Sequence, residues 1–258
     1  RNINRNNMIK KFFVTLIACS AVLVGCNNDD DNGVSKETKI PVEERNALDD
    51  EAIQQYMEDF YFNPKNGRLT KFDTIKGNDD DAYPTLKSLA KQDNLGIWYA
   101  ENPNHKGTGE TILSNDSTSI YISYNIGTFL ATNSTDYKRK YGSISTGGTP
   151  NSGDGSAVKD PSFYYFIPTE TEAKNGVKRE HLELKNFIEG LKHFKTTNRS
   201  TNDLYNFQGV IILPSRLAYG RNKVYSSGIG ISDQLSAYRD ISYIFNFELP
   251  KIEKRTTK

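Results

Sequence analysis

A tyrosine that follows a short apolar strand is the first residue in this sequence placed for chemistry. Val210 to Leu213 is an apolar, β-branched run, and Gly209 and Pro214 bound it, which is typical of a buried strand. Pro214 cannot donate a ladder hydrogen bond, so we expect the strand to end there. The chain then turns and presents Tyr219 just before Gly220. A tyrosine near the surface offers an apolar ring and a hydroxyl, which suits the binding of a ligand.

The residue types that commonly carry catalysis or bind metal are sparse. The three histidines and two cysteines show no metal-ligand spacing. No Gly-x-Ser-x-Gly or His-Glu-x-x-His motif occurs, which leaves hydrolase chemistry without a site. The sequence therefore predicts neither a metal centre nor a cofactor. We expect the histidines to be surface residues; they are His105, His181 and His193.

Four segments resemble one protein family in the order in which that family has them. Pro214 to Gly220 resembles the Pro-x-x-Leu-Ala-Tyr-Gly signature of FKBP-type peptidyl-prolyl isomerases. Phe187 to Leu191 looks like the family's Trp-Glu-Glu-Gly-Leu element, and Tyr243 to Leu249 alternates and resembles its closing strand, Phe-Asp-Val-Glu-Leu. The family's opening strands resemble three earlier pieces of the chain: Gly96 to Tyr99, Gly107 to Gly109, and Ile120 to Tyr124. The resemblance runs from about Leu95 to about Ile252.

The resemblance implies a fold and a set of site residues. The fold would be α+β: a curved antiparallel sheet, or half-barrel, wrapped around one main helix over Leu182 to Phe194, with a short N-terminal helix. The implied catalytic residues are Tyr124 on the first long strand, Phe187 as the floor, Tyr219 at the rim and Phe245 on the last strand. The implied substrate-binding residues are Phe163, Asp136, Leu184 and Ile188. The alternative is that the four aromatic residues are ordinary core side chains.

Prolyl isomerisation needs no covalent partner, which fits a site made of aromatic side chains. The barrier is the partial double bond of the amide, about 18–20 kcal/mol. The twisted transition state has lost that resonance and is less dipolar than the planar ground state, so an apolar pocket that excludes water favours it. Tyrosine hydroxyls at the rim would hold the substrate carbonyl.

The sequence departs from the family pattern in four places. Phe187 stands where the family usually has Trp, which keeps an aromatic floor but loses a donor. The family's Tyr-x-Gly is one residue longer here, from Tyr124 to Gly127. The Phe-Asp motif is not clearly present, because Thr135 precedes Asp136. The segment from Arg221 to Asp240 lacks the family's Ile-Pro pair. These four departures weaken the case for catalysis more than the case for the fold.

The composition is that of an ordinary globular protein. The chain has 258 residues, of which 25% are charged, and its formal net charge is +1. This balance gives no electrostatic case for nucleic-acid binding. The 15 Tyr and 13 Phe residues, with few helical stretches, favour a sheet-based fold.

The N-terminal region resembles a bacterial lipoprotein signal. Met8 is the expected start; Lys10 and Lys11 form a positive region, and an apolar stretch too short to span a bilayer comfortably follows. Leu23 to Cys26 resembles a lipobox, which predicts lipidation of Cys26. The alternative is a plain cleaved signal or an anchor helix. A lipidated Cys26 would leave the mature protein without a thiol, because the other cysteine, Cys19, lies inside the signal.

The polar stretch from Asn27 to Lys39 predicts a tether and a cell-envelope location. Its three consecutive aspartates resemble the surface-export signal of lipoproteins in Bacteroidetes-type bacteria. We therefore expect an outer-membrane lipoprotein, either on the periplasmic face or on the cell surface. The expected divisions are a signal region over 1–26, a tether over 27–44, a helical extension over 45–94 and the isomerase-like domain over 95–258.

Three further segments carry structural predictions. Asp49 to Phe60 has apolar residues at helical spacing, with acidic residues that suit a helix start. This helix either packs on the sheet or binds a partner. Asn78 to Asp81 lacks the spacing of a calcium loop, so we expect a solvated loop. Gly142 to Pro161 is rich in Gly, Ser, Thr and Asp and predicts a long loop.

Two functions remain open on the sequence alone. One is a lipid-anchored prolyl isomerase that acts on proline-containing polypeptides and assists the folding of exported proteins. The other is a non-catalytic binding module with the same fold, which recognises a peptide, a protein or a glycan. A structural part of an envelope machine is a third, weaker possibility. The expected partners are polypeptide substrates and, through the lipid, a membrane; the oligomeric state stays open.

Overall fold

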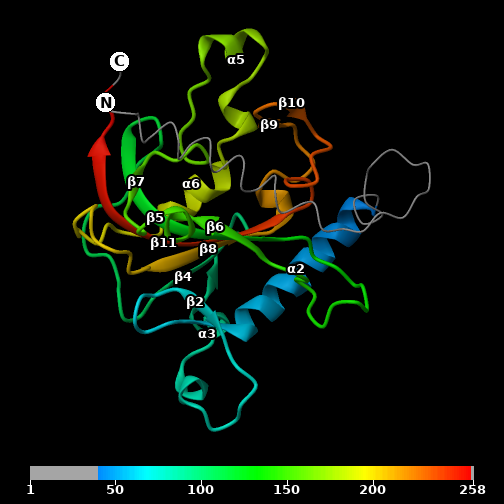
Figure 1. The fold of residues 1–258 in the computed structure, drawn as a ribbon, viewed down its shortest axis with the longest axis vertical. Helices are drawn as coiled ribbons and strands as arrows, with labels where there is room; N and C mark the ends of the chain where they lie inside the picture. The colour runs from blue at the N-terminus through cyan, green and yellow to red at the C-terminus, as the bar shows by residue number, and fades with distance from the viewer. Residues whose placement is uncertain (1–39, 257–258) are drawn as a thin grey trace.

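The computed structural model describes residues 40–256, so the predictions for the signal region, Cys26 and most of the tether lie outside the described residues. A seven-stranded sheet dominates this part of the chain (Figure 1). Six strands follow in the order β3-β4-β8-β11-β5-β6, and β7 pairs with β5; every recorded pairing is antiparallel. The prediction of a mixed α and β protein with an antiparallel sheet is confirmed.

The sheet strands have these bounds: β3 Lys91–Gln92, β4 Trp98–Glu101, β5 Thr118–Phe129, β6 Ser145–Gly148, β7 Val158–Lys159, β8 Gly209–Leu213 and β11 Ser242–Lys254. Two small hairpins stand outside it, β1 Phe60–Phe62 with β2 Leu69–Lys71, and β9 Val224–Ser226 with β10 Gly230–Ser232. The helices are α2 Val42–Asp59, α3 Leu86–Leu89, α4 Thr149–Ser152, α5 Glu170–Lys174 and α6 Lys185–Leu191, and the 3-10 turns are η3 Asp79–Ala82, η4 Arg179–His181 and η5 Ser215–Leu217.

Both faces of the sheet are covered, which explains why β8 is apolar without alternation. On one face, Ile211 and Leu213 of β8 join a core with α6, whereas Val210 and Ile212 join a second core with α2. Figure 1 shows the two helices on opposite sides of the central strands. The same alternation continues on β11, where Phe245 faces α6 and Ile244 faces α2. The predicted buried strand from Val210 to Leu213 is confirmed.

Helix α6 is shorter than predicted, but its apolar positions are as predicted. Leu184, Phe187, Ile188 and Leu191 are all buried, at 3%, 0%, 7% and 0% exposure. The helix begins at Lys185 rather than Leu182, because the main-chain N–H of Leu184 donates to the Phe163 carbonyl at 2.8 Å and the backbone there is extended. It approaches the sheet closely at Gly190, where a Cβ would lie 3.0 Å from Ile211. A side chain at this position would require Ile211 to shift by a few tenths of an ångström.

Helix α2 packs on the sheet, as one of the two sequence interpretations expected. It begins at Val42 rather than Asp49, with Pro41 at its N-cap and acidic residues Glu43 and Glu44 in its first turn. Asp49 therefore lies inside the helix, where it is fully buried instead of capping the start. None of the helices in the described chain has the length and apolar character needed to cross a membrane.

Two predicted loops contain regular structure. The segment from Gly142 to Pro161 holds β6, α4 and β7, because an edge strand can pair through its backbone without an apolar face. The aspartate run forms η3, and Asp80 is buried and accepts a bond from the Asp73 main-chain N–H at 3.1 Å. Residues 40–256 hold no cluster of His, Cys, Asp and Glu fit for a metal ion.

Candidate functional site

Four of the residues singled out in the sequence come together on the α6 face of the sheet. Tyr124 comes from β5, Phe163 from the segment after β7, Phe187 from α6 and Phe245 from β11. The Phe163 ring contacts all three others, with centroid separations of 5.1 Å to Tyr124, 5.1 Å to Phe187 and 5.3 Å to Phe245. Phe187 and Phe245 lie 4.4 Å apart. Residues that lie far apart in the sequence are therefore packed together in one aromatic cluster.

This aromatic cluster is closed by its own side chains. Phe187 and Phe245 have no exposed surface, and Phe163 and Tyr124 are 1% and 2% exposed. The Phe163 ring packs edge to face on Phe187, the residue that the family resemblance implies as a floor. Its backbone is held in place because its carbonyl accepts the Leu184 N–H bond described above. The four rings are therefore closed to solvent in this structure.

Tyr219 lies beside the cluster and is more buried than its predicted rim position implied. It is 5% exposed, and its hydroxyl donates to the main-chain carbonyl of Leu182 at 2.6 Å. Burial raises the pKa of Tyr219 well above its usual range, so the hydroxyl stays protonated and acts as a donor. The tight turn that presents it ends at Gly220, whose φ of 57° favours glycine.

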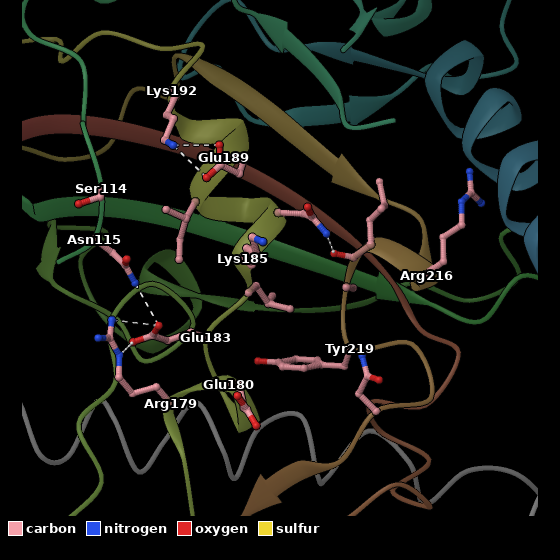
Figure 2. Close-up of a pocket in the computed structure, with 16 residues that line it drawn as sticks. Ser114, Asn115, Arg179, Glu180, Glu183, Lys185, Glu189, Lys192, Arg216 and Tyr219 are labelled. Carbon is pink, nitrogen blue, oxygen red and sulfur yellow. Dashed lines mark hydrogen bonds and ion pairs between the residues drawn. The ribbon is translucent and has the colours of Figure 1, made fainter. Parts of the chain in front are cut away.

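An open cleft of about 560 Å³ borders this tyrosine (Figure 2). Its apolar wall includes Tyr219, Leu184 and Ile188, which are three of the eight residues selected from the sequence. The side-chain amide of Asn186 donates to the Leu217 carbonyl at 2.9 Å and so ties α6 to the turn before Tyr219. The cleft thus lies between the start of α6 and the segment that resembles the isomerase signature.

The rest of the cleft is mostly polar, and most of its charged side chains pair within the protein. Arg179 donates to both oxygens of Glu183, at 2.7 and 3.1 Å, and to Asp116 at 2.6 Å. These bonds raise the pKa of Arg179, chiefly through Glu183. Lys192 bonds Glu189 at 2.9 Å on the opposite rim (Figure 2). The arrangement contains no paired nucleophile and base, so it suits binding and orientation rather than covalent catalysis.

Asp136 is the one selected residue that the structure keeps apart from the cluster and the cleft. It lies exposed in the segment after β5 and accepts a bond from the Ser134 hydroxyl at 3.2 Å. The histidines are also engaged elsewhere. His193 stacks on Tyr99 with centroids 3.9 Å apart and approaches Asp93 at 2.9 Å, and His105 approaches Glu248 at 3.2 Å.

Two tyrosines beside the site were not selected from the sequence. The rings of Tyr238 and Tyr243 contact the Tyr219 ring, with centroids at 5.4 and 5.7 Å. A signal for Tyr243 was available, since Tyr243, Phe245 and Phe247 alternate along β11 and so share one face. Tyr238 lies in an irregular segment, where no periodicity marks its burial.

Comparisons with known proteins give distant similarities to solved structures. No protein-family model matches the chain, and no curated protein matches it. A crystal structure of FkpA from Escherichia coli is 17% identical, with a TM-score of 0.33, over 64% of this chain and 52% of FkpA. The chain therefore spans about half the length of FkpA. A peptidyl-prolyl cis-trans isomerase from Pseudomonas syringae is 14% identical, with a TM-score of 0.38, over 83% of this chain and 98% of that protein. Neither similarity is close enough to assign a fold or an activity.

Proposed function

We propose that the chain is a peptidyl-prolyl cis-trans isomerase with an FKBP-like half-barrel around α6. One observation carries the proposal: Tyr219, Leu184 and Ile188 form the wall of an open cleft that adjoins the closed aromatic cluster. Two of the segments that resemble the isomerase family, Phe187 to Leu191 and Pro214 to Gly220, contribute residues to this cleft and so support the proposal. The substrates are proline-containing polypeptides, and the protein assists the folding of exported envelope proteins.

The proposed mechanism uses apolar surroundings and hydroxyl donors, without any covalent step. A prolyl ring enters over Phe187, and the Phe163 ring swings aside to admit it. The Tyr219 hydroxyl exchanges its bond with the Leu182 carbonyl for one with the substrate carbonyl, so no donor is lost. The surrounding rings exclude water and favour the twisted amide, which is less dipolar than the planar one.

A second candidate function is a non-catalytic polypeptide-binding module that uses the same cleft. Two contacts favour it: Phe163 already covers the floor, and the Tyr219 hydroxyl is already paired with the main chain. Such a protein would bind a polypeptide along the charged rim without admitting a prolyl ring. The two functions differ in whether the closed aromatic cluster opens.

The experiment is a protease-coupled isomerisation assay on the purified chain, run beside calorimetric binding of the same peptides. We expect acceleration by the wild type and a steep loss for Phe187→Ala, which opens the floor to water. Tyr219→Phe removes one hydrogen bond, worth about 0.5–1.5 kcal/mol, so a loss of about tenfold or less is expected. Circular dichroism on each variant separates loss of activity from loss of fold.

The outcomes separate the two candidates. Binding without acceleration of any Xaa-Pro peptide would remove the isomerase and leave the binding module. The absence of both would remove both functions. A Phe187→Ala variant that stays folded and fully active would show that the floor lies elsewhere.

We also propose that the protein is an outer-membrane lipoprotein, anchored through Cys26 and tethered by Asn27 to Lys39. The support is the lipobox-like Leu23 to Cys26 and the polar run after it. Two acyl chains give stable attachment, where one gives only marginal binding. Cys26→Ala should yield a soluble or unprocessed protein on fractionation. A processed variant that remained in the membrane fraction would contradict the lipid anchor, and protease shaving of whole cells would distinguish the surface from the periplasmic face.

A further inference from the structure

The hydroxyl of Tyr243 has no hydrogen-bond partner among residues 40–256, although the side chain is almost fully buried. Tyr243 is 1% exposed, and its hydroxyl oxygen is one of the few buried side-chain atoms left without a partner. Other buried tyrosines of this protein are paired: Tyr164 donates to the Thr118 carbonyl at 2.8 Å and Tyr141 to Asp59 at 2.7 Å. A buried donor without an acceptor destabilises a fold, so its presence calls for a reason.

The position of Tyr243 connects this hydroxyl to the proposed peptide site. Its ring meets Tyr219 edge to face, at 5.7 Å and 76°, and stacks on Phe245 at 5.9 Å and 15°. Tyr219 belongs to the cleft wall and Phe245 contacts the floor residue Phe187. The Tyr243 ring therefore contacts one residue of the cleft wall, Tyr219, and one residue that packs on the proposed floor, Phe245.

The backbone at Tyr243 is fixed, so the hydroxyl cannot move far to find another acceptor. Strand β11 is central, and Tyr243 pairs with Leu213 of β8 on one side and Thr128 of β5 on the other. A donor held in this way is pre-organised, because it loses no further conformational entropy when an acceptor binds.

The surroundings also select the kind of acceptor. Burial, with the nearby hydroxyls of Tyr219 and Tyr238, raises the pKa of Tyr243 well above its usual range, so the group remains a neutral donor. A charged ligand atom would lose its hydration at this depth without a counter-charge, which disfavours a carboxylate. A neutral peptide carbonyl is a hydrogen-bond acceptor and carries no charge, so it is the kind of acceptor that this site favours.

We propose that the Tyr243 hydroxyl is a second carbonyl-binding donor of the peptide site, beside Tyr219. This inference rests on the proposed function and adds a residue to it. When the Tyr219 hydroxyl leaves the Leu182 carbonyl for the substrate, the adjacent Tyr243 hydroxyl binds another carbonyl of the same peptide. The two donors together fix the peptide backbone on both sides of the bond that rotates.

The test compares Tyr243→Phe with a matched control, Tyr141→Phe. Both positions are buried, and both substitutions delete only a hydroxyl. Tyr141 belongs to the core on the α2 face of the sheet, away from the cleft. Each variant is measured for thermal unfolding, for kcat and KM, and for calorimetric affinity toward a tetrapeptide with a central Xaa-Pro bond. A tetrapeptide with Ala in place of Pro serves as the reference ligand.

Tyr243→Phe should be more stable than the wild type and bind less well. Removing an unpaired buried hydroxyl should raise the melting temperature by about 2–6 °C. Losing one hydrogen bond to the ligand should weaken peptide affinity by about threefold to tenfold. Tyr141→Phe should lower the melting temperature and leave the affinity unchanged, because its hydroxyl has a partner in the protein.

Two results would contradict the role of Tyr243 and leave the proposed function standing. A fall in the melting temperature of Tyr243→Phe would mean that the hydroxyl has a structural partner. Unchanged affinity and KM in that variant, with a wild type that binds the peptide, would mean that no ligand uses the hydroxyl. If the wild type neither binds nor isomerises any Xaa-Pro peptide, the proposed function fails, and the role of Tyr243 fails with it.

Discussion

The two faces of the central sheet are both buried, but they are held by different interactions. On the α2 face, Arg45 is 1% exposed and lies 3.8 Å from Asp49 and 3.9 Å from Asp240. Asp49 in turn accepts a bond from the Ser215 main-chain N–H at 2.9 Å. On the α6 face, ring contacts join many of the core side chains, among them Phe187 with Phe245 and Tyr219 with Tyr243.

This difference indicates that the two faces have different structural roles. Buried charges tolerate only one arrangement of their partners, so the α2 face can hold the turn before Tyr219 in a single position. Rings without charges can shift against one another at a smaller cost, and the proposed function requires such a shift on the α6 face. The three predictions below test this contrast, from the largest expected effect to the smallest.

The strongest test removes the central charge of the α2 face. Arg45→Ala removes the buried cation beside Asp49, while Asp240 keeps its two bonds from Arg221 at 2.8 and 3.0 Å. We expect a loss of about 3–5 kcal/mol in the free energy of unfolding. Arg216→Ala is the control, because its ion pair with Asp50, at 2.7 Å, ties η5 to α2 at the surface rather than in the core. The control should cost about 0–1 kcal/mol in urea denaturation. Equal effects would show that the buried charges do not hold α2.

The second test concerns the apolar attachment of α6. Leu191 is fully buried, so Leu191→Ala should cost about 2–5 kcal/mol. Leu113→Ala, at a position that is 77% exposed, provides the control and should change stability little. Denaturant titration of both variants measures the difference. A loss below about 1 kcal/mol at Leu191 would mean that the α6 face is loosely packed, which would extend the contrast between the faces.

The third test is the pH dependence that Asp49 gives to the α2 face. Burial raises the pKa of Asp49 from 3.8 to about 6, and this outweighs the opposing bonds from Ser215 and the charge of Arg45. The folded state therefore binds the proton more tightly than the unfolded state. The contribution of this group to stability is largest below pH 4, falls as pH rises from about 4 to 6, and is constant above that.

Asp49→Asn isolates this contribution, because the amide oxygen still accepts from Ser215 and carries no titrating proton. Between pH 4 and pH 7 the wild type should lose about 2–3 kcal/mol relative to the variant. Unfolding free energies at four pH values across this range measure the slope. A slope of the opposite sign would mean that the Arg45 ion pair, and not burial, controls the carboxylate.

Much of the fold could be predicted because its central elements carry strong periodic signals. The run from Val210 to Leu213 is apolar at every position, and the structure shows the reason in the two cores that share this strand. The apolar spacing of α6 placed its buried face correctly. The structure in Gly142 to Pro161 was missed, because β6 and β7 pair through backbone groups and need no apolar alternation.

The proximity of some selected residues could be predicted, while their role in a site stays a prediction. Of the five aromatic residues selected, Tyr124, Phe163, Phe187 and Phe245 lie together. The sequence could not show that Phe163 covers the floor, because that contact depends on how the segment after β7 folds back. Nor could it show the pairing of Tyr219 with Leu182, since a main-chain carbonyl has no sequence signature. Asp136 was selected by its spacing from Gly127, and spacing cannot anticipate a loop that turns away.

The position at which α2 packs has a consequence for how the chain folds during its synthesis. Asp49 and its partner Ser215 are separated by 166 residues. At a synthesis rate of about 5–20 residues per second, α2 waits on the order of 10 to 30 s before the strands that cover it exist. During this time its apolar side, which includes Ile53 and Met57, is open to aggregation or to a chaperone. Contacts of such long range also slow the final folding step.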